Sequence, residues 1–157
     1  MTRIFIDADA CPVKEDVYRV ARRYRLEVFV VANSRLRVPA ETLFQVVVVT
    51  GHFDAADDWI VEHILEGDIA VTSDIPLAAR CLEKRARVLD PKGRAFTEDS
   101  IGDALATREF SAFLRDMGTL TGGPAPYDPR DRSRFLQVLD DLIQASLRPK
   151  RPGSGRP

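Results

Sequence analysis

Five aspartates follow apolar runs of the type that forms buried strands, and their positions suggest a metal site. They are Asp7, Asp9, Asp54, Asp57 and Asp74. The apolar runs in front of them cover residues 4–6, 46–49 and 69–71. In an open α/β sheet, ligands bind in the crevice outside the carboxyl ends of the strands. Acids that are far apart in the sequence are therefore expected to meet there.

Carboxylates that cluster in this way favour a divalent cation. They repel one another and resist ionisation unless a positive charge lies among them. Mg²⁺ and Mn²⁺ prefer hard oxygen ligands, and a pair of such ions about 4 Å apart can activate water and stabilise the leaving oxygen of a phosphodiester. The alternative is that these aspartates cap helices and form turns. That alternative is strongest for Asp54 and for the neighbouring Asp58.

Several polar residues are candidates for binding the substrate. Thr72 and Ser73 lie beside Asp74, and Asn33 ends an apolar run, so their side chains could reach the same crevice. β-Propensity and turn chemistry are the simpler explanations for them. A second group could hold phosphate through backbone amides and guanidinium groups, or could form turns and a solvated helix face. It consists of Gly122, Gly123, Arg130 and Arg132.

Alternating strand and helix signals predict the fold that would bring the acids together. Strands are expected at 3–6, 26–32, 45–50, 69–72 and 88–89, and helices at 12–24, 55–65 and from 76 onward. Helices at 97–117 and 131–147 follow. The pattern predicts one three-layer α/β/α domain over residues 1–147, with about five mainly parallel strands and a helical C-terminal extension at about 97–147.

The remaining features of the chain are ordinary. Its 157 residues carry a net charge of −1, and the basic residues 148–157 are expected to form a disordered tail. No run is long and apolar enough to span a membrane and no signal-peptide core is visible, so the cytoplasm is the expected location. His52, His63, Cys11 and Cys81 lack ligand spacing. Trp59 and the phenylalanines have helical or strand spacing, so we expect them in the core rather than on a surface that stacks bases.

Seven short motifs together resemble the YaiI/YqxD family of uncharacterised bacterial proteins. They are residues 7–12 (Asp-Ala-Asp-Ala-Cys-Pro), 31–33 (Val-Ala-Asn), 53–57 (Phe-Asp-Ala-Ala-Asp), 67–68 (Gly-Asp), 72–78 (Thr-Ser-Asp-Ile-Pro-Leu-Ala), 121–124 (Thr-Gly-Gly-Pro) and 130–132 (Arg-Asp-Arg). The resemblance covers roughly residues 3–147. That family is regarded as PIN-like, which implies a sheet with an acid cluster like that of metal-dependent ribonucleases.

The resemblance implies a role for individual residues. Asp7 is similar to the acid of the first PIN strand, Asp57 to the helix acid, and Thr72 with Asp74 to the PIN Thr-x-Asp element. Asp9 and Asp54 match family positions without a generic PIN counterpart. Asp58 lies where the family pattern requires no acid, so we leave it out of the metal set.

Three functions remain open from the sequence. The leading hypothesis is an RNA-hydrolysing phosphodiesterase in which Asp7, Asp57 and Asp74 hold Mg²⁺ or Mn²⁺. The second is a non-catalytic module on the same scaffold that binds RNA or protein. The third is a haloacid-dehalogenase-type phosphatase, because a strand that ends in Asp-x-Asp also supplies that family's nucleophile and acid, here Asp7 and Asp9.

Overall fold

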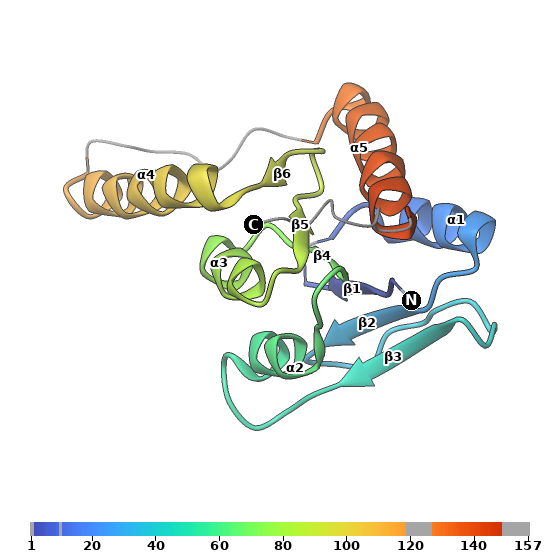
Figure 1. Ribbon diagram of the computed structural model, residues 1–157. Coiled ribbons are helices and arrows are strands. Elements are labelled where there is room, and N and C mark those ends of the chain that lie inside the picture. Colours follow the sequence, from blue (N-terminus) through green and yellow to red (C-terminus); the bar gives the residue numbers. More distant parts are fainter. Residues whose placement is uncertain (1, 10, 119–126, 149–157) are drawn as a thin grey trace.

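The computed structural model describes residues 2–9, 11–118 and 127–148, and within them the chain forms a single six-stranded sheet (Figure 1). The strands are β1 (Ile4–Asp7), β2 (Val28–Ala32), β3 (Phe44–Val48), β4 (Ile69–Val71), β5 (Arg87–Leu89) and β6 (Ala95–Phe96). Their order across the sheet is β3-β2-β1-β4-β5-β6. The first five strands pair in parallel, as predicted, while β6 pairs antiparallel with β5 and was not predicted.

Helices cover both faces of the sheet. They are α1 (Lys14–Tyr24), α2 (Ala55–His63), α3 (Ile75–Glu83), α4 (Glu98–Asp116) and α5 (Pro129–Leu147). Figure 1 shows α1 and α5 on one side of the strands and α2 and α3 on the other. The predicted three-layer α/β/α arrangement is therefore confirmed.

The alternation of side chains along β1 assigns each residue to one face. Ile4 and Ile6 belong to the core beneath α1 and α5, whereas Phe5 belongs to the core beneath α2 and α3. Successive strand residues point to opposite faces, so Asp7 points to the same side as Phe5. Asp7 therefore lies on the face that the amino ends of α2 and α3 reach.

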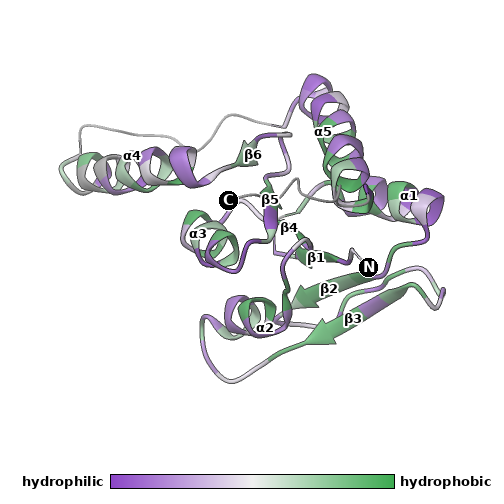
Figure 2. Ribbon diagram, in the orientation of Figure 1, coloured by the Kyte–Doolittle hydropathy of each residue, from purple (hydrophilic) through white to green (hydrophobic). Residues whose placement is uncertain are grey.

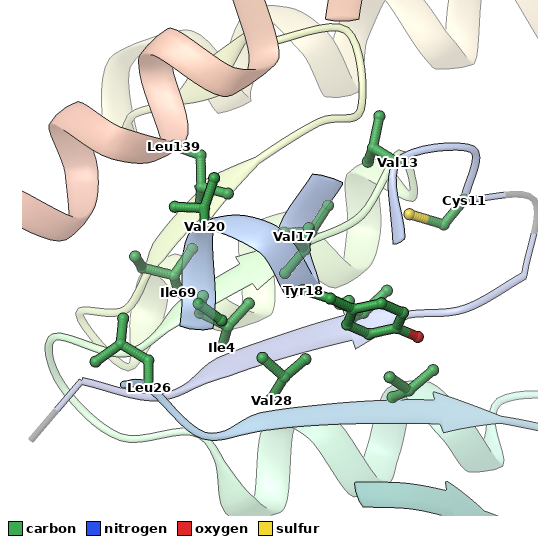
Figure 3. Close-up of a cluster of buried hydrophobic side chains, with 14 of the residues drawn as sticks. Ile4, Cys11, Val13, Val17, Tyr18, Val20, Leu26, Val28, Ile69 and Leu139 are labelled. Carbon is green, nitrogen blue, oxygen red and sulfur yellow. The ribbon is translucent and has the colours of Figure 1, made fainter. Parts of the chain in front are cut away.

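The core beneath α1 and α5 is apolar and closely packed. Figure 3 shows Val17 and Val20 of α1 and Leu139 of α5 meeting Ile4 and Ile69 of the sheet. The burial of each such aliphatic side chain stabilises the fold by about 1.5–3 kcal/mol. In Figure 2, β1 and β2 are coloured as hydrophobic, as expected for strands that helices cover on both faces.

The predicted helix at 97–117 is present as α4, which extends away from the sheet in Figure 1. The Thr97 hydroxyl accepts a hydrogen bond from the Ser100 backbone N–H over 3.1 Å, so Thr97 caps this helix as predicted. Within the part of the chain that the structure describes, no helix is long and apolar enough to cross a membrane.

The strand order places a topological switch point between β1 and β4. From β1 the chain moves outward to β2 and β3, then returns to pair β4 with the other edge of β1. A crevice opens outside the carboxyl ends of the strands where the direction of winding reverses. The segments that carry the five aspartates all begin at these carboxyl ends.

Candidate functional site

Hydrogen bonds through Thr72 connect the acid of β1 to the start of α3. The buried Thr72 hydroxyl donates to Asp7 Oδ2 over 2.9 Å and accepts from the Asp74 backbone N–H over 3.0 Å. Asp74 is the N-cap of α3, where its Oδ1 accepts from the Leu77 backbone N–H over 3.0 Å. The Thr-x-Asp element therefore links the carboxylate at the end of β1 to the one that caps α3.

Three of the predicted catalytic acids act on one another electrostatically. Burial raises the pKa of Asp7 above its ordinary value, and the charges of Asp9 and Asp74 raise it further, against a hydrogen bond from Thr72. The pKa of Asp57 rises from 3.8 to about 6, first because of burial and then because of Asp74, Asp7 and Asp54. Asp7, Asp57 and Asp74 thus influence one another electrostatically, and their predicted role as a catalytic set stays a prediction.

Two successive aspartates of α2 have opposite environments. Asp58 lies 2.9 Å from His52 Nε2 and 3.0 Å from an Arg80 guanidinium nitrogen. These two partners hold the pKa of Asp58 below its ordinary value. Asp57 has acids as its main neighbours, and Arg80 is the weakest of the influences on its pKa. The exclusion of Asp58 from the metal set agrees with its two ion pairs.

The two remaining acids of the predicted set lie at the rim of the crevice. Asp9 is exposed, and its Oδ2 accepts a hydrogen bond from the Asn33 amide over 3.1 Å. Asn33 therefore contacts another predicted site residue directly. Asp54 occupies the N-cap position of α2, yet its side chain accepts no capping hydrogen bond. Helix capping therefore does not explain the presence of a carboxylate at Asp54.

The donor set suits a hard divalent cation in its chemistry, although the side chains do not enclose one. Across residues 2–9, 11–118 and 127–148, no three acidic, histidine or cysteine side chains stand close enough to hold one metal ion. Mg²⁺ usually takes only one or two protein carboxylates and fills its other positions with water and substrate phosphate. The grouped carboxylates are consistent with that open kind of site.

The two arginines of the second group of predicted substrate ligands form ion pairs within the chain. Arg132 forms a forked pair with the buried Asp16 of α1 at 2.8–3.1 Å, and Arg130 pairs with Asp128, the N-cap of α5. Gly122 and Gly123 lie outside the described residues. Phosphate binding by this group stays a prediction.

Ser73 lies exposed between Thr72 and Asp74, with its own role as a substrate ligand untested. The two histidines contact neighbours in α2: His52 pairs with Asp58, and the His63 ring stacks on Trp59 with centroids 3.9 Å apart. Both cysteines, Cys11 and Cys81, are buried and free. These contacts explain the histidines and cysteines as parts of the scaffold.

The expectation that all phenylalanines belong to the core is wrong for one of them. Phe53, directly before Asp54, is 95% exposed, whereas Phe5 and Phe135 are completely buried. The residue lies in the connection between β3 and α2, which the helical periodicity of 55–65 does not reach. The helical or strand spacing on which the expectation rested therefore does not hold for Phe53.

Comparison with known proteins supports the resemblance given by the motifs. A family model described as the uncharacterised YaiI/YqxD family matches residues 5–145. A UPF0178 protein of Rhodospirillum centenum is 60% identical over 94% of this chain and 99% of its own length. UPF0178 proteins of Paramagnetospirillum magneticum and Brucella ovis are 55% and 54% identical, over 94% and 96% of this chain and 98% and 92% of their own lengths. No solved structure matches the chain significantly.

Proposed function

This chain belongs to the YaiI/YqxD family of uncharacterised proteins, and from that premise and its acid cluster we propose that it is a metal-dependent phosphodiesterase that hydrolyses RNA. Asp7, Asp57 and Asp74 are the ligands of Mg²⁺ or Mn²⁺ in this proposal, and Asp9 and Asp54 stand beside them. RNA is the substrate that the resemblance to PIN-like ribonucleases suggests, which is an argument by analogy of fold.

One observation carries the proposal: the pKa of Asp57 is raised to about 6 by burial and by three other aspartates. A carboxylate that serves only the fold usually has a basic partner beside it, as Asp58 has in Arg80. Perturbed acids in a cleft are typical of functional sites. Asp57 and its acidic neighbours fit a site whose missing partner is a cation.

The groups around the crevice would have separate roles in binding and hydrolysis. Thr72 holds the Asp7 carboxylate in place through its hydroxyl. The amino ends of α2 and α3 carry partial positive charge, which favours a phosphate group in the crevice. A bound divalent ion would supply Lewis-acid polarisation of the phosphodiester and activation of water.

The test measures hydrolysis of an end-labelled single-stranded RNA in the presence of Mn²⁺. We expect wild type to cleave, and we expect Asp7→Asn and Asp74→Asn to lose at least about 100-fold in rate, since even residues that only support a ligand cost 10- to 100-fold. Glu62→Gln is the matched control, because Glu62 is an exposed acid of α2 beyond the first turn. Equal rates for wild type and Asp74→Asn would refute the proposed ligands.

A second measurement does not depend on turnover. A ligand that binds only the native state raises the free energy of unfolding by about 2.7 kcal/mol at 100 times its Kd. Millimolar Mn²⁺ should therefore raise the Tm of wild type and of Glu62→Gln, but not that of Asp74→Asn. Salt-sensitive RNA binding without turnover, unchanged in Asp74→Asn, would instead support the non-catalytic RNA-binding module.

A further inference from the structure

Phe53 is the most exposed of the large hydrophobic side chains that the structure describes, and its ring gives up the stabilisation that burial supplies. The ring is 95% exposed and its residue is adjacent to Asp54 at the acid crevice. Most other phenylalanines with described side chains, including Phe44 and Phe96, are buried. Phe53 therefore presents a large aromatic ring to solvent next to one of the five aspartates, Asp54.

An ordered turn holds Phe53 in this position. The His52 carbonyl accepts a hydrogen bond from the Ala55 backbone N–H over 3.2 Å, so Phe53 and Asp54 form the corner of a turn. The side chain of His52 is bound to Asp58 at 2.9 Å, and Asp58 is bound to Arg80 of α3 at 3.0 Å. These contacts attach the turn to α2 and α3.

The surroundings of the ring fit a planar, uncharged partner. A protein-docking surface needs a contiguous apolar area of several hundred Å². Phe53 instead follows Gly51 and His52 and precedes Asp54. In the absence of a cation the acids beside it disfavour a phosphate group at the ring, but they do not prevent an uncharged base from lying against it. Every nucleobase has a π-face that stacks on an aromatic side chain.

We propose that Phe53 stacks an unpaired nucleobase of the substrate, and that the substrate is therefore single-stranded RNA. The inference rests on the proposed function, because the acid crevice next to Asp54 supplies the reason for a polynucleotide to lie there. The bases of a duplex are already stacked on one another, so they cannot use the ring. Phe53 thus selects single strands over duplexes.

The experiment separates binding from cleavage. Binding of a fluorescently labelled single-stranded RNA and of the same RNA annealed to its complement is measured without added metal in an Asp74→Asn background, which is not expected to cleave. In that background we compare Phe53 with Phe53→Ala and Phe53→Tyr. Leu65→Ala is the matched control, because Leu65 is also exposed, at 59%, but follows the carboxyl end of α2, away from the acids.

We expect Phe53→Ala to weaken single-strand binding by about fivefold or more, the effect of losing one stacked base. Phe53→Tyr should bind within about twofold of the parent, and Leu65→Ala should bind as the parent does. Duplex binding should be weaker and should not respond to Phe53→Ala. Because the ring makes little contact with the fold, the Tm of Phe53→Ala should equal that of its parent.

The outcomes keep this proposal distinct from the proposed function. If Phe53→Ala weakens single-strand binding while wild type never cleaves RNA, the stacking of a base on Phe53 is supported and the proposed nuclease activity is refuted. If wild type cleaves RNA while Phe53→Ala changes neither KM nor the affinity for single-stranded RNA, the nuclease activity is supported and base stacking is refuted. Base stacking would also be refuted if Phe53→Ala lost the same affinity for duplex as for single-stranded RNA, or if Phe53→Tyr lost as much affinity as Phe53→Ala.

Discussion

Asp57→Asn should make the metal-free protein more stable at neutral pH, although it removes a proposed metal ligand. The folded protein holds this carboxyl at a pKa of about 6, against an ordinary value of 3.8. Above pH 6 the folded state must therefore keep a charge that its acidic neighbours and burial disfavour. Asparagine has nearly the same shape and carries no charge, so it removes both the cost of burying a charge and the repulsion by the neighbouring acids.

The gain in the free energy of unfolding of Asp57→Asn follows from the difference between the folded and the ordinary pKa of Asp57. The difference between about 6 and 3.8 corresponds to about 3 kcal/mol. Asp57 is only partly buried, so solvent screening reduces this to roughly half. The acid also lies in the first turn of α2, where a negative charge is favourable by about 0.5 kcal/mol, and that contribution is lost. The net gain is therefore about 1 kcal/mol, or about 2–4 °C in Tm for a chain of this length.

The dependence on pH has a definite sign. Between pH 7.5 and 5, a folded state with the raised Asp57 pKa takes up a proton that the unfolded state does not take up. This uptake raises the free energy of unfolding of wild type as the pH falls through 6, and the advantage of Asp57→Asn shrinks with it. The raised pKa of Asp7 makes the free energy of unfolding depend on pH in the same direction. Both proteins contain Asp7, so the difference between wild type and Asp57→Asn reports on Asp57.

The assay is urea unfolding with EDTA at pH 7.5 and pH 5, followed by the same series with Mn²⁺. Asp58→Asn is the contrast, because it removes a carboxylate that His52 and Arg80 stabilise, so it should be no more stable than wild type. With Mn²⁺ the order of wild type and Asp57→Asn should reverse. An Asp57→Asn protein that is less stable than wild type at pH 7.5 in EDTA would refute the electrostatic argument.

Three further substitutions test individual contacts. Thr72→Val removes a buried hydroxyl that donates to Asp7, so it should lower the free energy of unfolding by ~2 kcal/mol in urea titrations, and Thr72→Ser should restore most of it. Gly93→Ala adds a Cβ about 2.7 Å from the α5 backbone at a φ of +91°, and calorimetry should find it less stable by ~2 kcal/mol. Arg132→Met leaves the buried Asp16 unpaired and should lower the Tm more than the double variant with Asp16→Asn, because removal of both partners leaves no buried charge.

The sequence predicted the parallel strands and the helices because each carries its own periodicity. The apolar runs of β1 and β2 and the proline at the start of α3 are local signals. β6 has only the two residues Ala95–Phe96, too few for an alternating pattern to be visible, and it is held by its pairing with β5. α5 begins at Pro129, two residues before the predicted start, because Asp128 and Asp131 form a capping box.

The acid group was expected for a different reason. The carboxyl ends of parallel strands share one edge of the sheet, so Asp7, Asp57 and Asp74 were expected to meet once the strands were identified. The partners of Arg132 could not be predicted in this way. Its pairing with Asp16 depends on how α5 packs against α1, across 116 positions of sequence, and no local pattern encodes that distance. Phe53 was misassigned because a single apolar residue in a connection has no period.

The pairing of β1 with β4 has a consequence for the order of events during synthesis. The residues joined in this pair are separated by 65 positions. One edge of β1 therefore stays unpaired until β4 has left the ribosome. Asp74 follows β4 and comes last among the three acids. A nascent chain would thus carry an incomplete set of ligands while it is still attached to its own messenger RNA. In the proposed nuclease, this order keeps the set of ligands incomplete until the middle of the chain has been synthesised.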